Sequence, residues 1–344
     1  MLHLRLFSLM TLVLLLVACA PLVPATTPGA TPLPPGDSTV LKTPEAAELQ
    51  HLDVGVGFIP NVQFAPFYVA QAKGFYAEEG LDVALEYGFE NDFVALTAQG
   101  SRQFAVASGD QVILARAQGL PLVYVMKWYE RFPVGVMALA ETGIDSPEEL
   151  AQRKVGIPGL FGATFVGWKA LVHATGLDEA SLELVEIGFT QAAAVSEKQV
   201  DAALVYLANE PIQLSEAGLP VNVIEVSAYI DLVSNGLVTN ETIIEENPEL
   251  IRKLARGTLR GLAYTIERRD EAFEIVRDFV PEITDADASI QRLVLERSIE
   301  LWQSDQPGLS SAAAWQNSAD FMFEAGLIEA PLEVDKLYTN EFVE

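Results

Sequence analysis

The residues of this sequence best suited to chemistry are aromatic and polar side chains that follow runs of β-branched residues. In open α/β sheets ligands bind beside the loops that follow the strands, and planar ligands stack against aromatic faces. Any one of these aromatic residues could equally pack in a core, but their recurrence at successive strand ends favours a ligand site. The predicted ligand-binding residues are Phe58, Asn61, Phe64, Ser108, Asp110, Trp128, Tyr129, Phe161, Tyr206, Asn209 and Glu210, with Phe189 as a further aromatic candidate.

Three of these polar residues have two interpretations. Ser108 and Asp110 stand in "ASGDQ", where a predicted strand gives way to a helix. A side chain there can cap the helix, or a ligand can use the free N–H groups. Glu210 could accept a hydrogen bond from a ligand, or it could be the N-terminal charge of the helix that follows.

Groups that could catalyse a reaction are scarce. The chain has three histidines and one cysteine. It has no His pair at metal-ligand spacing, no CxxC, no GxSxG, no P-loop and no GxGxxG. His173 falls in an apolar helical stretch and is predicted to be a partly exposed helix residue, and the many carboxylates are typical of a solvated surface. We therefore predict a binding protein, not an enzyme, with no catalytic residue, metal or cofactor.

The elements that must position the candidate residues alternate between strand and helix from His51 onward. Short strands separated by helices of 8 to 15 residues predict a mostly parallel sheet with helices on both faces, and hence an α/β fold. A second cycle begins at Ser146, where "SPEE" has the pattern of a capping box. From Pro248 to Phe323 the pattern is almost continuously helical. The predicted strands are 52–58, 81–89, 104–109, 121–129, 154–159, 182–189, 201–207 and 221–227.

The N-terminus has the pattern of an export signal. Arg5 precedes an uncharged apolar run that ends at Ala18, and this run is shorter than the about 20 residues that span a bilayer. The sequence Leu16-Val17-Ala18-Cys19 resembles the lipobox of bacterial lipoproteins. This resemblance implies a signal peptide over 1–18 and fatty acylation of Cys19, palmitate included, which would anchor the protein to a membrane. The alternative is an ordinary signal peptide with a chance cysteine at its cleavage site.

Residues 19–50 are predicted to be a disordered linker, because Pro, Thr, Gly and Ala without apolar periodicity cannot bury enough surface to offset the entropy of ordering. About 300 residues remain, which is enough for two domains. The chain carries 48 acidic and 21 basic side chains, a net charge of −27. Nucleic-acid binding is therefore not expected, since phosphate contacts need clustered Lys and Arg. Contact with the membrane is expected through the lipid anchor only.

The stretch "GFIPNVQFAPFYVAQAKGFYAEEGLDVAL" resembles the N-terminal signature of bacterial ABC-transporter solute-binding proteins that bind thiamine pyrimidines, riboflavin, alkanesulfonates or nitrate. The likeness continues through "FAVASGDQVILARAQGLPLVYV", "GIDSPEELAQRKVGIPG" and "ALVYLANEP" to "SNGLVTNE". It implies a two-lobed, periplasmic-binding-protein-like fold of type II with a helical C-terminal tail. It also implies ABC permease and ATPase subunits as partners, and a location on the extracytoplasmic face of the cell membrane.

In such a fold two chain crossings join the lobes, and the lobes close over a ligand by a hinge motion. The resemblance places the crossings near Val134–Ala140 and Leu232–Thr239. Lobe I would comprise residues 52–137 and 236–344, and lobe II residues 138–235.

The predicted ligand is uncharged and planar, because the second lobe has few Lys or Arg residues with which to hold an anion. Within the family the likeness is to the thiamine-pyrimidine and riboflavin binders, whose shared motif resembles Asn209–Pro211. Riboflavin is favoured, because Phe58 stands where the pyrimidine binders carry tryptophan and because the further aromatic residues suit a tricyclic ring. Formylaminopyrimidine, a thiamine precursor, is the alternative. Pyrimidine synthesis is less favoured, since the chain lacks the cysteine-rich motif of the related enzymes.

Overall fold

The computed structural model describes residues 48–343, which group as one compact unit. The predicted signal peptide, Cys19 and nearly all of the predicted linker lie outside the described residues. The end of the linker, predicted at residue 50, is placed slightly late. Gln50 already opens the first strand, where its N–H donates to the carbonyl oxygen of Gly80 at 2.9 Å.

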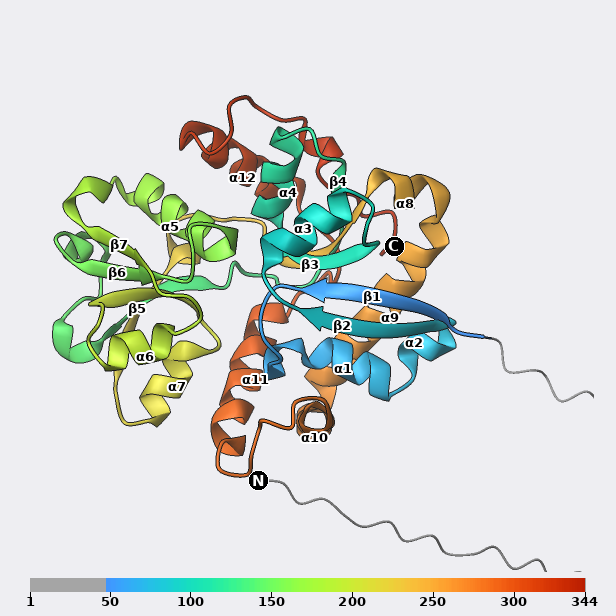
Figure 1. Ribbon diagram of the computed structural model, residues 1–344, viewed down its shortest axis with the longest axis horizontal. Helices are drawn as coiled ribbons and strands as arrows, with labels where there is room; N and C mark the ends of the chain where they lie inside the picture. The colour runs from blue at the N-terminus through green and yellow to red at the C-terminus, as the bar shows by residue number, and fades with distance from the viewer. Residues whose placement is uncertain (1–47, 344) are drawn as a thin grey trace, which may run out of the picture. The chain divides into compact units, whose positions relative to one another are not determined.

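The first sheet has five strands in the order β2-β1-β3-β10-β4 (Figure 1). β1 pairs in parallel with β2 and β3, whereas β10 is antiparallel to both β3 and β4. The sheet is therefore mostly parallel, as the alternation of strands and helices predicts. Its strands are β1 (Gln50–Val56), β2 (Leu81–Tyr87), β3 (Phe104–Ser108), β4 (Leu122–Lys127) and β10 (Asn235–Asn240).

The second sheet repeats this arrangement in the order β7-β6-β8-β5-β9. Here β6 pairs in parallel with β7 and β8, and β5 is the antiparallel strand between β8 and β9. The elements built around the first and second sheets are called the first and second lobe below. The strands of the second sheet are β5 (Val134–Leu139), β6 (Lys154–Ile157), β7 (Glu183–Glu186), β8 (Ala202–Tyr206) and β9 (Val221–Glu225).

The chain passes between the sheets twice, and each passage delivers the antiparallel strand of the sheet that it enters. The first passage covers residues 128–133 and leads into β5, and the second leads from β9 into β10. The predicted first crossing at Val134–Ala140 is therefore wrong, and so is the lobe boundary at residue 137. Val134 pairs with Tyr206, well inside the second sheet. All six residues of β5 are buried, so no polar alternation marks this strand in the sequence.

Helices cover both sheets. The sequence pattern of residues 67–80 favours one helix, but Gly74, with φ +73°, divides this stretch into α1 and α2. The capping box at Ser146 is present, although the turn that it opens, Pro147–Leu150, is a 3-10 helix. The turn after β6 leads into α5 at Gly162. The helices before β10 are α1 (Ala65–Ala72), α2 (Phe75–Glu78), α3 (Glu90–Ala98), α4 (Gly109–Ala117), α5 (Gly162–Thr175), α6 (Gln191–Ser196) and α7 (Glu210–Glu216).

The predicted C-terminal helices are present and belong to the first lobe, because α9 and α10 pack against α1. Figure 1 shows α9, α10 and α11 in orange beside the first sheet and α1. None of the helices in the described part of the chain is long and apolar enough to span a membrane. The helices after β10 are α8 (Glu241–Glu246), α9 (Pro248–Glu267), α10 (Arg269–Phe279), α11 (Ala288–Trp302) and α12 (Ala312–Glu324).

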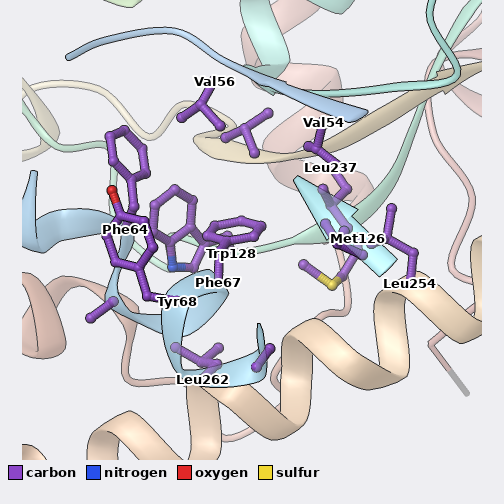
Figure 2. Packing of buried hydrophobic residues seen from close by; sticks show 14 of the residues in the cluster. Val54, Val56, Phe64, Phe67, Tyr68, Met126, Trp128, Leu237, Leu254 and Leu262 are labelled. Carbon is purple, nitrogen blue, oxygen red and sulfur yellow. The ribbon is translucent and has the colours of Figure 1, made fainter. Parts of the chain in front are cut away.

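The core of the first lobe lies on both faces of its sheet. Along β3, Phe104 and Val106 belong to one hydrophobic cluster, whereas Ala105 and Ala107 belong to another. This division follows from the period of two in a strand, which sends successive side chains to opposite faces. Figure 2 shows the first cluster, where Trp128 lies among the rings of the helix that follows β1. This aromatic core reaches the edge of the sheet where the strands end.

Candidate functional site

A pocket opens where the carboxyl ends of the strands of both sheets meet. It holds about 830 Å³ of space free of protein atoms, part of it open to solvent. The strand-end loops supply most of its wall, which is the position that open α/β sheets use for ligands. The lining residues are Gly57, Phe58, Gln63, Phe64, Phe89, Glu90, Val106, Trp128, Tyr129 and Asn235 from the first lobe, and Pro158, Phe161, Gly162, Thr164, Phe189, Gln191, Tyr206, Asn209 and Glu210 from the second.

The inner wall of the pocket on the first lobe is a rigid aromatic surface. Phe64, Trp128 and Tyr129 are almost fully buried. The Trp128 ring lies 5.9 Å from Phe64 and packs edge-to-face on Phe67 at 5.0 Å, and Figure 2 shows these three rings together. The centroid of the Tyr129 ring lies 4.8 Å from that of Trp128. Because each ring is held by its neighbours, this wall presents apolar surface at little cost in side-chain entropy.

Four phenylalanines join the two lobes at the outer part of the pocket. Phe89 of the first lobe stacks on Phe189 of the second at 5.4 Å and meets Phe161 edge-to-face at 5.5 Å. Phe58 also meets Phe189 edge-to-face, at 5.1 Å. Phe89, Phe161 and Phe189 remain 44%, 36% and 39% exposed, so this bridge is far more open to solvent than the inner wall.

Buried carboxylates give the pocket its polar character. Glu90, the first residue of α3, accepts hydrogen bonds from the Ser108 N–H at 2.5 Å and the Ser108 hydroxyl at 2.9 Å. Burial raises the pKa of Glu90, and the nearby charge of Asp110 raises it further. Burial likewise raises the pKa of Asp110, which accepts from the Gln111 amide at 2.7 Å. Both carboxyl groups therefore lose part of their charge at a higher pH than exposed acids do.

The second lobe contributes a third acid, Glu210, at the start of α7. Its carboxylate accepts a hydrogen bond from the Tyr206 N–H at 3.2 Å, and burial raises its pKa to about 7. Asn209 accepts from the Gln213 side chain at 2.7 Å, and the Tyr206 hydroxyl donates to Asn235 Oδ1 at 3.4 Å. These bonds hold hydrogen-bonding groups in fixed positions around an otherwise apolar pocket.

The structure brings most of the predicted site residues together, and their contact with a ligand stays a prediction. Asn61, Ser108 and Asp110 do not line the pocket. Asn61 Oδ1 accepts a hydrogen bond from the N–H of Gln63 at 2.9 Å and so caps a helical turn. Ser108 and Asp110 lie behind Glu90. The predicted residues in the wall are Phe58, Phe64, Trp128, Tyr129, Phe161, Tyr206, Asn209 and Glu210, together with Phe189.

Sequence reasoning missed Phe89 and Glu90, although the rule that found the other aromatic residues applies to them. They follow Gly88, the first residue after β2, but the predicted strand runs through residue 89 and so leaves no loop at this position. Gln63, Thr164, Gln191 and Asn235 were missed because isolated polar residues near strand ends carry no pattern of their own.

The described residues show no arrangement suited to metal binding. No group of three His, Cys, Asp or Glu side chains in residues 48–343 could hold an ion. His51 Nδ1 bonds to Asp82 at 2.8 Å, and His173 Nε2 lies 3.4 Å from Glu324. Neither histidine lines the pocket. The site is thus equipped for stacking and hydrogen bonding.

The two lobes have the same strand order and enclose an aromatic pocket, which together define a periplasmic-binding-protein fold. Solved structures of binding proteins share this fold. The alkanesulfonate-binding protein SsuA from Xanthomonas axonopodis pv. citri, bound to MOPS, superposes with a TM-score of 0.68 at 14% identity. That match covers 86% of this chain and 100% of SsuA. The nitrate-binding protein NrtA from Synechocystis PCC 6803 also gives 0.68 at 14% identity, over 87% of this chain and 88% of its own.

The chain belongs to the NMT1/THI5-like family, whose model matches residues 61–272. It is 41% identical to the riboflavin-binding protein RibY of Chloroflexus aurantiacus, over 100% of this chain and 99% of that protein. It is 29% identical to a formylaminopyrimidine-binding protein of Halalkalibacterium halodurans, over 85% and 90% of the two chains. A 4-amino-5-hydroxymethyl-2-methylpyrimidine phosphate synthase of Legionella pneumophila is 24% identical, over 82% and 89%.

Proposed function

We propose that this protein is the extracytoplasmic substrate-binding component of an ABC importer, and that its ligand is riboflavin. The observation that carries this proposal is the pocket between the lobes, with aromatic side chains from both lobes in its wall. The full-length similarity to a protein named for riboflavin binding supports the same ligand. This proposal includes the two-lobed binding protein and the planar heteroaromatic ligand that the sequence predicts.

The isoalloxazine ring of riboflavin needs flat apolar surface on both faces. Phe64, Trp128 and Tyr129 form the wall of the first lobe, and Phe161 and Tyr206 come from the second. A tricyclic ring between these walls would be covered on both faces by aromatic side chains. Stacking of this kind is worth about 0.5–1.5 kcal/mol per pair beyond the area buried.

The polar residues of the wall suit the ring edge and the ribityl hydroxyl groups. Asn209, Glu210 and Asn235 offer acceptors and donors from the second lobe and from β10, and Gln63 and Thr164 add to them. A hydroxyl group both donates and accepts. The ribityl chain can therefore pair with carboxyl and amide groups alike, which an apolar pocket alone would not allow.

Binding without catalysis is the activity that these residues support. The groups around the pocket are amides, carboxyls, a phenol and a threonine hydroxyl, with no cysteine or histidine in its wall to act as nucleophile or base. The relatives named as pyrimidine phosphate synthases are distant, at about a quarter identity. We therefore assign no enzymatic role and no cofactor to this protein, and riboflavin is its transported ligand.

Membrane attachment rests on the sequence of the N-terminal region, outside the described residues. Cys19 would carry the acyl chains after cleavage of residues 1–18, and the linker would hold the lobes clear of the lipid surface. The permease and ATPase subunits of the importer would be the partners, and the closed lobes the surface that the permease recognises.

Flavin fluorescence tests the proposal directly. Riboflavin stacked on Trp or Tyr should lose its emission, so titration of the purified protein into dilute riboflavin should quench the signal and saturate at one ligand per chain. Phe161→Ala, in the pocket, should weaken binding about tenfold. Phe323→Ala removes a phenylalanine that is 41% exposed on α12 and should change nothing.

Formylaminopyrimidine is the second candidate, because of the relative named for binding it. Unchanged flavin emission, together with a rise in melting temperature on adding formylaminopyrimidine, would move the assignment to that ligand. Formation of a product from a pyrimidine precursor would contradict the assignment as a binding protein.

A further inference from the structure

Glu90 reaches from the first lobe to the N-terminus of a helix in the second. Its carboxylate is held by the N–H and hydroxyl of Ser108 on the first lobe. On the other side it faces the first turn of α5. A Cβ built on Gly162 would lie 3.4 Å from Glu90 Oε2, and the backbone N–H of Ala163 stabilises the charged carboxylate. One side chain thus spans the pocket from lobe to lobe.

The position that Glu90 fills is the one where an anionic ligand would be expected. A 14-residue helix such as α5 concentrates free N–H groups and partial positive charge at its first turn. Here the protein's own carboxylate occupies that turn. Gly57 permits this arrangement, because a Cβ at residue 57 would come within 2.6 Å of Glu90 Cβ and push α3 away.

The remaining charges around the pocket have the same sign. Asp110 lies close enough to Glu90 for its charge to raise the pKa of that carboxyl, and Glu210 lines the pocket from the opposite lobe. Burial raises the pKa of the Tyr206 phenol, and the charges of Glu90 and Asp110 raise it further. None of the described residues that line the pocket is Lys, Arg or His. A phosphate group in the pocket would meet carboxylates without a counter-charge, in surroundings that screen charge less than water does.

We infer that Glu90 is a specificity-determining residue, which makes the pocket reject anionic ligands and so take riboflavin rather than its 5′-phosphate. This inference rests on the proposed function and narrows it to the uncharged flavin. Ser108 is the positioning residue that keeps the carboxylate turned toward α5. Where the available flavin is phosphorylated, its phosphate ester must be hydrolysed before this protein can bind it.

The test compares the dissociation constants of riboflavin and riboflavin 5′-phosphate at pH 8, for the wild-type protein and for Glu90→Gln. Glutamine matches glutamate in size, and its Oε1 can still accept both Ser108 bonds. Its Nε2 cannot accept from the Ala163 N–H, but the loss of that contact should affect both flavins alike, whereas the ratio of the two dissociation constants reports the charge. The wild-type protein should bind riboflavin about 100-fold more tightly than the phosphate ester. In Glu90→Gln the ratio of the two dissociation constants should be smaller by a factor of about ten. Glu186→Gln, an exposed residue of β7, makes the same change in net charge and should leave the ratio unaltered.

The outcomes separate this inference from the proposed function. Equal binding of the two flavins by the wild-type protein, or an unchanged ratio in a folded Glu90→Gln, overturns the role of Glu90 and leaves riboflavin binding intact. If the wild-type protein binds neither flavin, the proposed function fails, and this inference fails with it. A purely structural role of Glu90 would lower the affinity for both flavins by the same factor, which also overturns it.

Discussion

Phe89 of the first lobe and Phe189 of the second stack on each other, with ring centroids 5.4 Å apart and planes inclined by 28°. The two residues are a hundred positions apart in the sequence, and each follows a strand of a different sheet. Phe161 and Phe58 complete the bridge with edge-to-face contacts. Because these rings come from both lobes, any opening of the pocket must break them apart, and the bridge links ligand exchange to the hinge motion.

Removing one ring of this bridge should speed ligand release. We expect Phe89→Ala to raise the riboflavin dissociation rate about tenfold, since it deletes two ring contacts that hold the lobes together. Stopped-flow recovery of flavin fluorescence measures this rate. Phe323→Ala serves as the matched control, and an unchanged rate in Phe89→Ala would show that the bridge does not restrain opening.

Glu210 can be tested with two substitutions that separate its roles. Glu210→Ala leaves the Tyr206 N–H without its partner and should lower the free energy of unfolding by about 1–3 kcal/mol. Glu210→Gln keeps an acceptor and should restore most of that loss. Urea denaturation measures stability, and flavin titration measures affinity. Weaker binding with stability intact in Glu210→Ala would instead identify a direct ligand contact.

The buried acids predict that the protein becomes more stable as the pH falls from 7.5 toward 5. Burial raises the pKa of Glu210 to about 7, and it also raises the pKa of Glu90 and Asp110. Unfolded Glu and Asp titrate near 4. Between these values the folded state binds more protons than the unfolded state, so the free energy of unfolding decreases as the pH rises.

Urea denaturation at pH 5.5 and 7.5 tests whether the free energy of unfolding decreases as the pH rises. In Glu210→Gln one of the three groups no longer titrates, and the gain in stability on acidification should shrink. Below about pH 4.5 the trend should reverse, because hydrogen bonds hold the pKa of Glu79, Glu149 and Glu271 below the ordinary value. Greater stability at pH 7.5 than at 5.5 would contradict the prediction.

Cys19→Ser tests the lipid anchor. Serine cannot form the thioether, so the variant should move from the membrane fraction to the soluble extracytoplasmic fraction and lose label from radioactive palmitate. Ser38→Ala, in the linker, is the control and should stay with the membrane. A membrane-bound, unlabelled wild-type protein would contradict lipidation.

Much of the fold could be predicted from local patterns. Apolar runs bounded by turn residues marked most strands, Ser146 marked the start of a helical turn, and aromatic residues at strand ends marked most of the pocket wall. The prediction failed where the local signal was absent. β5 is buried along its whole length and so has no polar alternation, and its residues are those that the resemblance places in a connection between the lobes.

The sequence by itself determined the class of fold, the alternation of elements and the kind of ligand that suits them, because these depend on residue types and on spacing along the chain. Only the tertiary structure decided which polar residues face the pocket and which form hydrogen bonds within the protein instead. Asn61 caps a helix turn, Ser108 holds Glu90, and Glu90 reaches α5 of the other lobe. The Asn61 cap is local, but the two pairings of Glu90 join residues far apart in the chain, so no local pattern encodes them. The contact with α5 arises only where the two sheets bring their carboxyl ends together.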